Sequence, residues 1–198
     1  RLPQSLPMSK SVNENTNIAM GIERLSTLFR AALWDNAKQC GLSPLQVQIM
    51  LFIASHMQTL NNVSCLAKEF GVTKATVSDA VKTLLDKKLL KKQSSGDARV
   101  FSLHLTASSH TQLQQLGSLA ACVDEALASA SATERKKIWE GLVLLIGHLQ
   151  KTSIIPLRMC LTCQHYEKRK SLPYCHLLQQ SLQLEDIRLD CPEHLLAA

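Results

Sequence analysis

The fold is decided by residues 66–78, which read LAKEFGVTKATVS. Leu66 belongs to a short helix that ends at Gly71, because glycine tolerates the left-handed conformation of a helix terminus. A second helix begins at Thr73, with Val77 on its apolar face and small polar and cationic side chains on the other. A short helix, a glycine turn and a polar cationic helix, in this order, are typical of a helix-turn-helix.

The segment that follows predicts a wing. Residues 89–92 form a short strand, and residues 99–105 alternate in hydropathy as the returning strand of a hairpin does. Residues 93–98 join them and are rich in serine, glycine and aspartate, which favour turns.

Helices precede this unit. Residues 18–38 carry apolar side chains at helical spacing, and a second helix, apolar nearly all round, follows the capping box that Ser43 and Gln46 form. We expect this second helix to be the central buried one. Ser64 is expected to cap the short helix at 65–70.

Two long helices are predicted after the wing. Thr106 can cap the first, and Ser131 with Glu134 forms a capping box for the other, which ends before Pro156. Their apolar stripes indicate core or dimer interface and comprise Leu113, Leu116, Ala120, Val123 and Leu127 on the first and Ile138, Leu142, Leu145 and Leu149 on the second. The predicted fold class is mainly α, a winged helix-turn-helix with long N- and C-terminal dimerisation helices and a small cysteine-rich C-terminal extension.

Charge and composition narrow the classes of function. The formal net charge is +6, and between Lys68 and Arg99 eight basic residues stand against four acidic ones, which favours a polyanionic partner. No apolar run approaches the roughly 20 residues that a bilayer requires, so a transmembrane protein is excluded. The sequence shows no paired carboxylates, Ser/His/Asp set or phosphate-binding glycine loop, so we do not expect an enzyme.

Together these motifs resemble the MarR family of bacterial transcription regulators. The resemblance spans roughly residues 18–152 and rests on residues 66–78, the leucine pairs at 84–85 and 89–90, Asp97-Ala98-Arg99 and residues 103–106. It implies a homodimer built by the outer helices, recognition helices in successive major grooves and wing tips in the minor groove. By position, Arg99 is the wing arginine, and Asp97 holds it in place by a paired hydrogen bond.

The sequence departs from the family pattern at three positions. Lys88 stands where a glycine usually precedes the wing strand, Ala98 where a second arginine is common, and His110 where a glycine often follows Leu-Thr.

These observations predict a homodimeric, sequence-specific DNA-binding regulator, a repressor whose bound operator excludes polymerase. Lysines give affinity through phosphates, and the outer face of the recognition helix selects the sequence. The predicted DNA-contacting residues are Thr73, Lys74, Thr76, Ser78, Lys82, Lys91, Lys92 and Arg99, with Asp97 as support of the wing.

Cysteines crowd the end of the sequence. A Cys-x2-Cys pair, Cys160 and Cys163, is followed by Cys175 and Cys191. Without a secretory signal we expect a cytoplasmic, reducing location, where such a cluster binds metal more often than it forms disulfides. Zinc and an iron–sulfur cluster both suit four thiolates, and the proline after Cys191 slightly favours the cluster. A short helix is expected over residues 177–184.

This metal site has two possible roles: it senses redox state or metal, or it stabilises the structure. His165, His176 and His194 lie beside the cysteines and are expected to support them, one of them replacing a cysteine as the alternative. Two other functions remain as alternatives: a winged-helix scaffold with structural zinc that acts in protein interaction, and a redox or metal protein without DNA binding.

The predicted organisation has five segments. They are residues 1–17, a disordered or vector-derived N-terminus; 18–42, the N-terminal dimerisation helix; 43–106, the DNA-binding lobe; 107–155, the C-terminal dimerisation helices; and 156–198, the cysteine-rich extension.

Overall fold

The computed structural model describes residues 13–94, 101–115, 119–150 and 156–197. The helices are α1 (Glu14–Gln39), α2 (Pro44–Ser55), α3 (Val63–Glu69), α4 (Lys74–Asp86), α5 (Ala107–Gln115), α6 (Leu119–Ala126) and α7 (Ala132–Leu149), with 3-10 turns at Gln58–Leu60, Cys160–Thr162 and Leu184–Asp186. The strands are β1 (Leu90–Ser94), β2 (Phe101–Leu105), β3 (Tyr166–Glu167), β4 (Tyr174–Cys175) and β5 (Gln180–Ser181). None of these helices is long and apolar enough to cross a bilayer.

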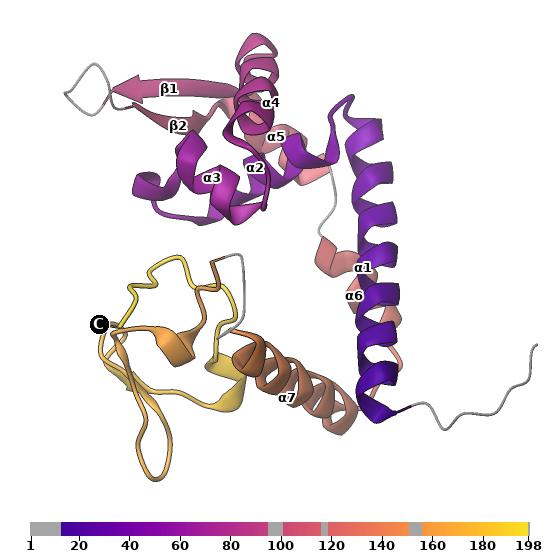
Figure 1. Ribbon diagram of the computed structural model, residues 1–198, viewed down its shortest axis with the longest axis vertical. Coiled ribbons are helices and arrows are strands. Elements are labelled where there is room, and N and C mark those ends of the chain that lie inside the picture. Colours follow the sequence, from indigo (N-terminus) through magenta and orange to yellow (C-terminus); the bar gives the residue numbers. More distant parts are fainter. Residues whose placement is uncertain (1–12, 95–100, 116–118, 151–155, 198) are drawn as a thin grey trace, which may run out of the picture.

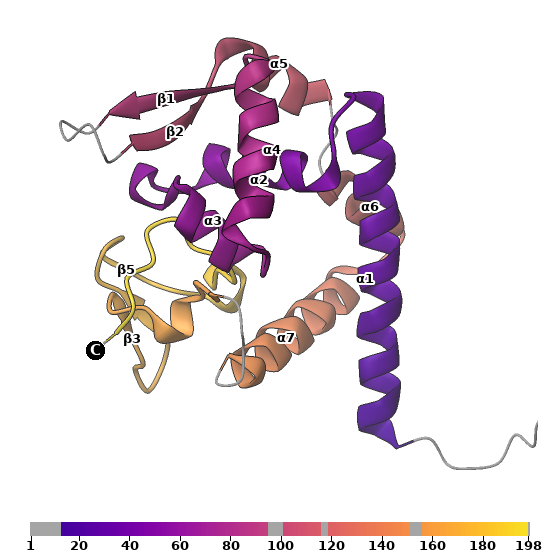
Figure 2. The same ribbon diagram turned by 45° about the horizontal axis from the view of Figure 1, so that its top comes forward.

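The elements form two folded bodies joined by helices (Figure 1). Helices α2 to α5 and the β1–β2 hairpin form the lobe, residues 42–115 without the undescribed wing tip. Helix α1 runs down one side of the molecule and α7 crosses its far end (Figure 1). The tail, residues 156–197, lies next to α3 on the side of the lobe away from the wing, as the turned view also shows (Figure 2).

A continuous apolar core holds the lobe together. Ile49 and Met50 of α2 are fully buried against Leu66 of α3, Leu84 of α4 and Leu103 of β2. Helix α2 contacts α1, α4, α5 and β2, which confirms that the apolar second helix is the central one. The mainly helical winged-helix fold expected from the sequence is therefore confirmed.

Both predicted capping boxes are present. The Ser43 amide donates to Gln46 Oε1 at 2.8 Å and the Gln46 amide to Ser43 Oγ at 3.3 Å, with Pro44 in the first turn. At α7, the Ser131 amide donates to Glu134 Oε2 at 2.8 Å. These reciprocal bonds satisfy backbone donors that a helix terminus otherwise leaves unpaired.

The predicted start of the short helix was wrong by two residues. Asn62 is the N-cap of α3, and its Oδ1 accepts from the Cys65 amide at 3.0 Å, so Ser64 lies inside the first turn. Asparagine and serine cap with similar strength, so the surrounding chain decides between them. The short helix does end at a left-handed Gly71, whose φ is +62°.

The outer helices also differ from the expectation. Helix α1 begins at Glu14, so the N-terminal segment expected to be disordered to residue 17 is helical from residue 14. The helix expected to run on from Thr106 is described as α5 and α6, and residues 116–118 between them lie outside the described residues. Residues 1–12 lie outside them as well.

The tail is built from very short elements. Strands β3, β4 and β5 pair in that order as an antiparallel sheet, and its small core comprises Val143 of α7, Met159, Leu182 and Ile187. The helix predicted over residues 177–184 was wrong, because residues 180–181 form β5 and the Leu182 amide donates to the Pro173 carbonyl at 2.7 Å. In a stretch this short, the pairing of β5 with β4 determines the conformation, and the helical spacing of the leucines does not.

Candidate nucleic-acid interface and thiol site

Helix α4 presents a polar face on a buried support. Its buried side chains are Val77, Ala80, Val81 and Leu84. On the opposite face, the predicted contact residues Thr73, Lys74, Thr76, Ser78 and Lys82 are all exposed. The structure therefore brings these five predicted residues together on one open surface.

Two hydroxyls at the start of α4 are held in place. Thr73 is the N-cap, and its Oγ1 accepts from the Thr76 amide at 3.1 Å. The hydroxyls of the two threonines also share a hydrogen bond of 2.8 Å. Lys74 and Lys82 form no ion pair with a described carboxylate, so their ammonium groups face solvent. A helix N-terminus flanked by such groups suits phosphate.

The wing continues this cationic surface. Strands β1 and β2 pair from Leu90 with Leu105 to Ser94 with Phe101. Lys91 and Lys92 are exposed, and the Lys92 ammonium lies 4.5 Å from the centre of the Phe101 ring, which lays the lysine along the hairpin. The predicted wing-tip residues Asp97 and Arg99 lie outside the described residues.

The departure at Lys88 has a conformational consequence. Lys88 has a φ of +59°, the left-handed region that favours glycine, at the turn between α4 and β1. Its carbonyl accepts a hydrogen bond of 2.8 Å from the Thr106 hydroxyl and another from Ser108. These bonds hold the strained turn and fix the base of the wing against the start of α5.

The four predicted thiols meet in the tail. Cys160 begins a 3-10 turn, Cys163 follows that turn, Cys175 lies in β4 and Cys191 lies in the last loop. All four line one cavity of about 30 Å³, and none of them forms a disulfide. Segments 31 residues apart in the sequence are thus brought to the same small space.

The surroundings of Cys160 suit a metal-bound thiolate. Its Sγ accepts a hydrogen bond of 3.3 Å from the Arg188 amide, as sulfur ligands of metals commonly do. Burial raises the pKa of the Cys160 thiol, and the neighbouring thiols add to this rise against the effect of that amide. A cation among the thiols acts in the opposite direction, because it stabilises the deprotonated form.

The four cysteines suit a metal by their residue type and by the cavity that they share. As the side chains stand, no group of three or more Cys, His, Asp or Glu among the described residues is arranged to hold a metal ion. Cys160, Cys163, Cys175 and Cys191 nevertheless face one cavity and offer the four sulfur donors that zinc or an iron–sulfur cluster uses.

The tail histidines take different places. His165 lines the thiol cavity, whereas His176 Nε2 lies 2.9 Å from Glu167 Oε2. His194 Nε2 lies 3.1 Å from the Thr162 hydroxyl, and burial, with nearby Arg158, lowers the pKa of His194. Only His165, among these three, lines the cavity with the cysteines.

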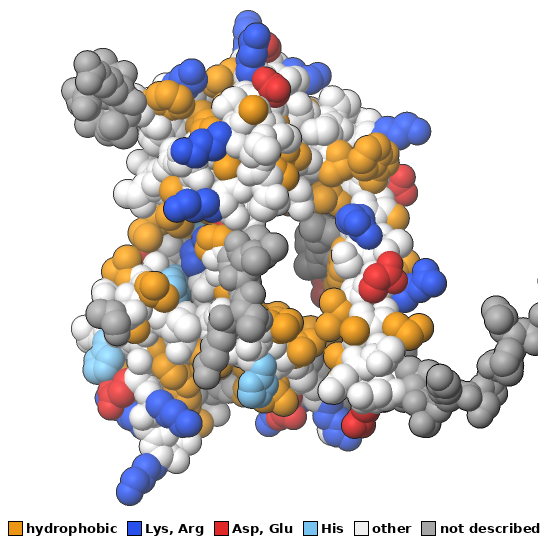
Figure 3. Space-filling model, viewed as in Figure 1, with side chains coloured by type: hydrophobic (Ala, Val, Ile, Leu, Met, Phe, Trp, Pro, Cys, Tyr) orange, Lys and Arg blue, Asp and Glu red, His pale blue; other side chains and the backbone are white. Residues whose placement is uncertain are grey.

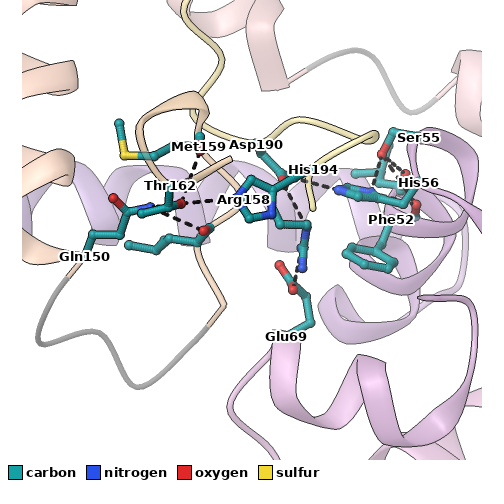
Figure 4. A network of polar contacts seen from close by, with 12 residues as sticks. Phe52, Ser55, His56, Glu69, Gln150, Arg158, Met159, Thr162, Asp190 and His194 are labelled. Carbon is teal, nitrogen blue, oxygen red and sulfur yellow. Dashed lines mark hydrogen bonds and ion pairs between the residues drawn. The ribbon is translucent and has the colours of Figure 1, made fainter. Parts of the chain in front are cut away.

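A junction between the tail and the lobe, shown in Figure 4, was not predicted from the sequence. Arg158, only 9% exposed, donates to Glu69 at the end of α3 and, through Nε, to Asp190 Oδ1 at 3.1 Å. Its guanidinium lies 5.1 Å from the centre of the Phe52 ring of α2. A buried arginine, two carboxylates and an aromatic ring thus connect segments far apart in the chain.

A histidine of α2 completes the junction. His56 Nδ1 lies 3.0 Å from the Phe52 carbonyl, and its ring stacks on the Phe52 ring. His56 Nε2 lies 3.1 Å from Asp190 Oδ2, within ion-pair distance although outside hydrogen-bond geometry. The spacing of charged residues along the sequence carries no signal for such contacts, because they depend on how the tail docks.

Part of the lobe matches a known protein family in sequence. Residues 41–99 match the model of the MarR family. No curated protein matches the chain in sequence. The matched residues include α2, α3, α4 and β1, which carry the exposed face described above.

Solved structures share the fold at low sequence identity. A MarR transcriptional regulator from Methanosarcina mazei Go1 superposes with a TM-score of 0.56 and 18% identity, covering 69% of this chain and 98% of that chain. The MepR–DNA complex of S. aureus gives a TM-score of 0.55 and 18% identity, covering 72% of this chain and 100% of that chain. A transcriptional regulator from Thermotoga maritima gives 0.51 and 17%, covering 69% and 96%. The chain thus has the fold of MarR-type regulators.

Proposed function

We propose that the chain is a MarR-type transcription regulator that binds double-stranded DNA through α4 and the wing. The observation that carries this proposal is the exposed face of Thr73, Lys74, Thr76, Ser78 and Lys82 above a fully buried helix-turn-helix core. The family match over residues 41–99 and the fold shared with MepR, which was solved with DNA, support it.

The chemistry of the face suits a major groove. Small side chains let the backbone of α4 approach the base edges, where hydroxyls donate and accept hydrogen bonds. Lys74 and Lys82 reach phosphates beside the helix, and Lys91 and Lys92 reach phosphates beside the wing. The lysines supply salt-dependent affinity, and the hydroxyl-bearing face supplies sequence preference.

A homodimer is proposed because the outer helices expose large apolar side chains. They are Ile18, Met20, Ile22, Leu25, Leu28 and Trp34 on α1 and Ile138, Leu142, Leu144 and Leu149 on α7. Apolar side chains gather along the lower edge of the opening in the space-filling view (Figure 3). Exposed apolar side chains in such number often mark an interface between proteins. The dimer would act as a repressor by occupying an operator that polymerase requires.

We propose that Cys160, Cys163, Cys175 and Cys191 hold a metal. A bound metal would tie together three segments of the tail, and a change in its occupancy or oxidation state could then be reported to the lobe. Four thiolates suit either a zinc ion or an iron–sulfur cluster. Anaerobic purification separates the two: a cluster gives brown protein with visible absorbance, whereas zinc gives colourless protein with one ion per chain.

Selection from a random DNA pool tests the main proposal. We expect enrichment of a sequence with two related half-sites, as a dimer requires, and sedimentation of the free protein as a dimer. Failure to enrich any sequence, with the protein folded and dimeric, would favour the protein-interaction alternative.

A further inference from the structure

The tail–lobe junction connects the thiol site to the helix-turn-helix by a short route. Two of its residues adjoin thiols: Asp190 precedes Cys191, and Arg158 lies two residues before Cys160. The Cys191 amide donates to the Arg158 carbonyl at 2.8 Å, so the backbone around both thiols is tied to the arginine. Ordering of the thiols therefore orders Arg158 and Asp190.

On the lobe side, the junction ends at the turn of the helix-turn-helix. Glu69 is the last residue of α3, and its side chain is 16% exposed. Phe70, Gly71 and Val72 lie between Glu69 and the N-cap of α4, and the Val72 amide donates to the Ala67 carbonyl at 3.1 Å. Holding Glu69 thus holds the turn that sets the direction of α4.

Burial makes this connection specific. Arg158 and Glu69 form a largely buried pair, with side chains 10% and 16% exposed, whereas Asp190 is 53% exposed. Loss of Glu69 therefore leaves the charge of Arg158 poorly compensated. The tail and lobe therefore dock in one arrangement or separate. A two-state contact of this kind can transmit occupancy of one site to another.

We propose that Arg158 couples metal occupancy of the four thiols to the position of α3 and α4, so that metal binding raises DNA affinity. The inference rests on the proposed DNA-binding function and on the thiols as ligands. The docked tail leaves Thr73, Lys74, Thr76, Ser78 and Lys82 exposed, so docking does not block the proposed DNA-contacting face. Metal binding favours docking of the tail on the lobe. Docking holds α3 in place, and α4 is then ordered before DNA binds. In this scheme Arg158 and Glu69 are positioning residues.

The test compares full-length protein with and without Zn²⁺, using DNA selected from a random pool. We expect Zn²⁺ to raise the DNA affinity of the unaltered chain about tenfold, a typical size for coupling between sites. Glu69→Gln keeps the shape of the side chain and removes its charge, so it should bind Zn²⁺ but lose most of this effect. By linkage, DNA should raise the Zn²⁺ affinity of the unaltered chain by the same factor and that of E69Q far less.

Glu167→Gln is the matched control. Glu167 also pairs with an arginine of the tail, Arg169, at 2.7 Å, but this pair is exposed and does not touch the lobe. E167Q should keep the full effect of Zn²⁺ on DNA affinity. Equal zinc effects in E69Q and the unaltered chain, or no zinc effect or a lower DNA affinity with zinc in the unaltered chain, would overturn the proposal.

A measurement without DNA separates this proposal from the proposed function. Zn²⁺ should slow hydrogen exchange of the Phe70 and Val72 amides in the unaltered chain and in E167Q, and not in E69Q. If no DNA is bound in any state, the DNA-binding function fails while hydrogen exchange still decides the coupling. Zinc-independent exchange at both amides would overturn the coupling even where DNA binding is found.

Discussion

The lobe and the tail are stabilised by different means within one chain. The lobe buries large aliphatic side chains from α2, α3, α4 and β2 in one core. Among the described residues, the core of the tail is small and comprises Met159, Leu182 and Ile187 with Val143 of α7, and its strands are two residues long. A folded unit of this size with so small a core needs a metal or a comparable cross-link. We therefore expect the lobe to fold without the tail, and the tail to depend on the metal proposed at its thiols.

Removal of the proposed metal is the largest expected effect, and it should unfold the tail while the lobe keeps its helices. Apparent binding free energies of structural zinc reach about 10 kcal/mol, more than the small tail core can replace. Trp139 reports on the tail, because its indole N–H donates to the Leu184 carbonyl at 2.9 Å. In a Trp34→Phe background, in which Trp139 is the remaining tryptophan, chelation should shift the fluorescence to longer wavelength while lobe helicity persists.

A thiol substitution repeats this test without chelator. Cys163→Ser should give the same fluorescence change as metal removal, because it takes away one of the four ligands. Cys65→Ser, at a thiol of α3 outside the cavity, is the control and should leave the emission unchanged. If C163S gave the same emission as the metal-loaded protein, the tail would not depend on this thiol for its structure.

A cavity made by mutation in the lobe core should destabilise the lobe and leave the tail unchanged. Leu66 of α3 is fully buried in the lobe core, so Leu66→Ala should lower the free energy of unfolding of the lobe by about 3 kcal/mol. Urea denaturation followed by circular dichroism measures this loss, and metal content serves as the control that should not change. If the free energy of unfolding fell by less than about 1 kcal/mol, Leu66 would not lie in a tightly packed core.

The N-cap of α3 gives a smaller effect. Asn62→Ala should lower the free energy of unfolding by about 1 kcal/mol, because the Cys65 amide loses its side-chain acceptor. Ser64→Ala, the residue first expected to cap, should change stability by less than half as much. The same urea experiment compares both variants, and the reverse order would restore Ser64 as the cap.

The sequence was sufficient where a local rule decides the structure. The capping boxes at Ser43 and Ser131 and the left-handed Gly71 follow from chemistry within a few residues, and all were predicted. The outer face of α4 follows from helical periodicity. The four cysteines that line the thiol cavity were also predicted to lie together, because they cluster in the sequence.

Prediction failed where distant contacts decide. The leucines of residues 177–184 have helical spacing, but pairing of β5 with β4 determines their conformation. The bond between Arg158 and Glu69 joins residues 89 positions apart and depends on how two bodies dock. Single charged residues of this kind resemble ordinary surface residues until the docked structure shows that they are buried.

Binding of selected DNA across a range of salt concentrations, with Lys74→Ala compared with the unaltered protein, tests the central claim most directly. If α4 contacts the duplex, K74A should bind more weakly, and its slope of log affinity against log salt should be smaller by about one, the loss of one phosphate contact. Lys136→Ala, at an exposed lysine of α7 away from α4, should match the unaltered protein. Equal affinity and slope for K74A and the unaltered chain would contradict the assignment of α4 as the DNA-contacting helix.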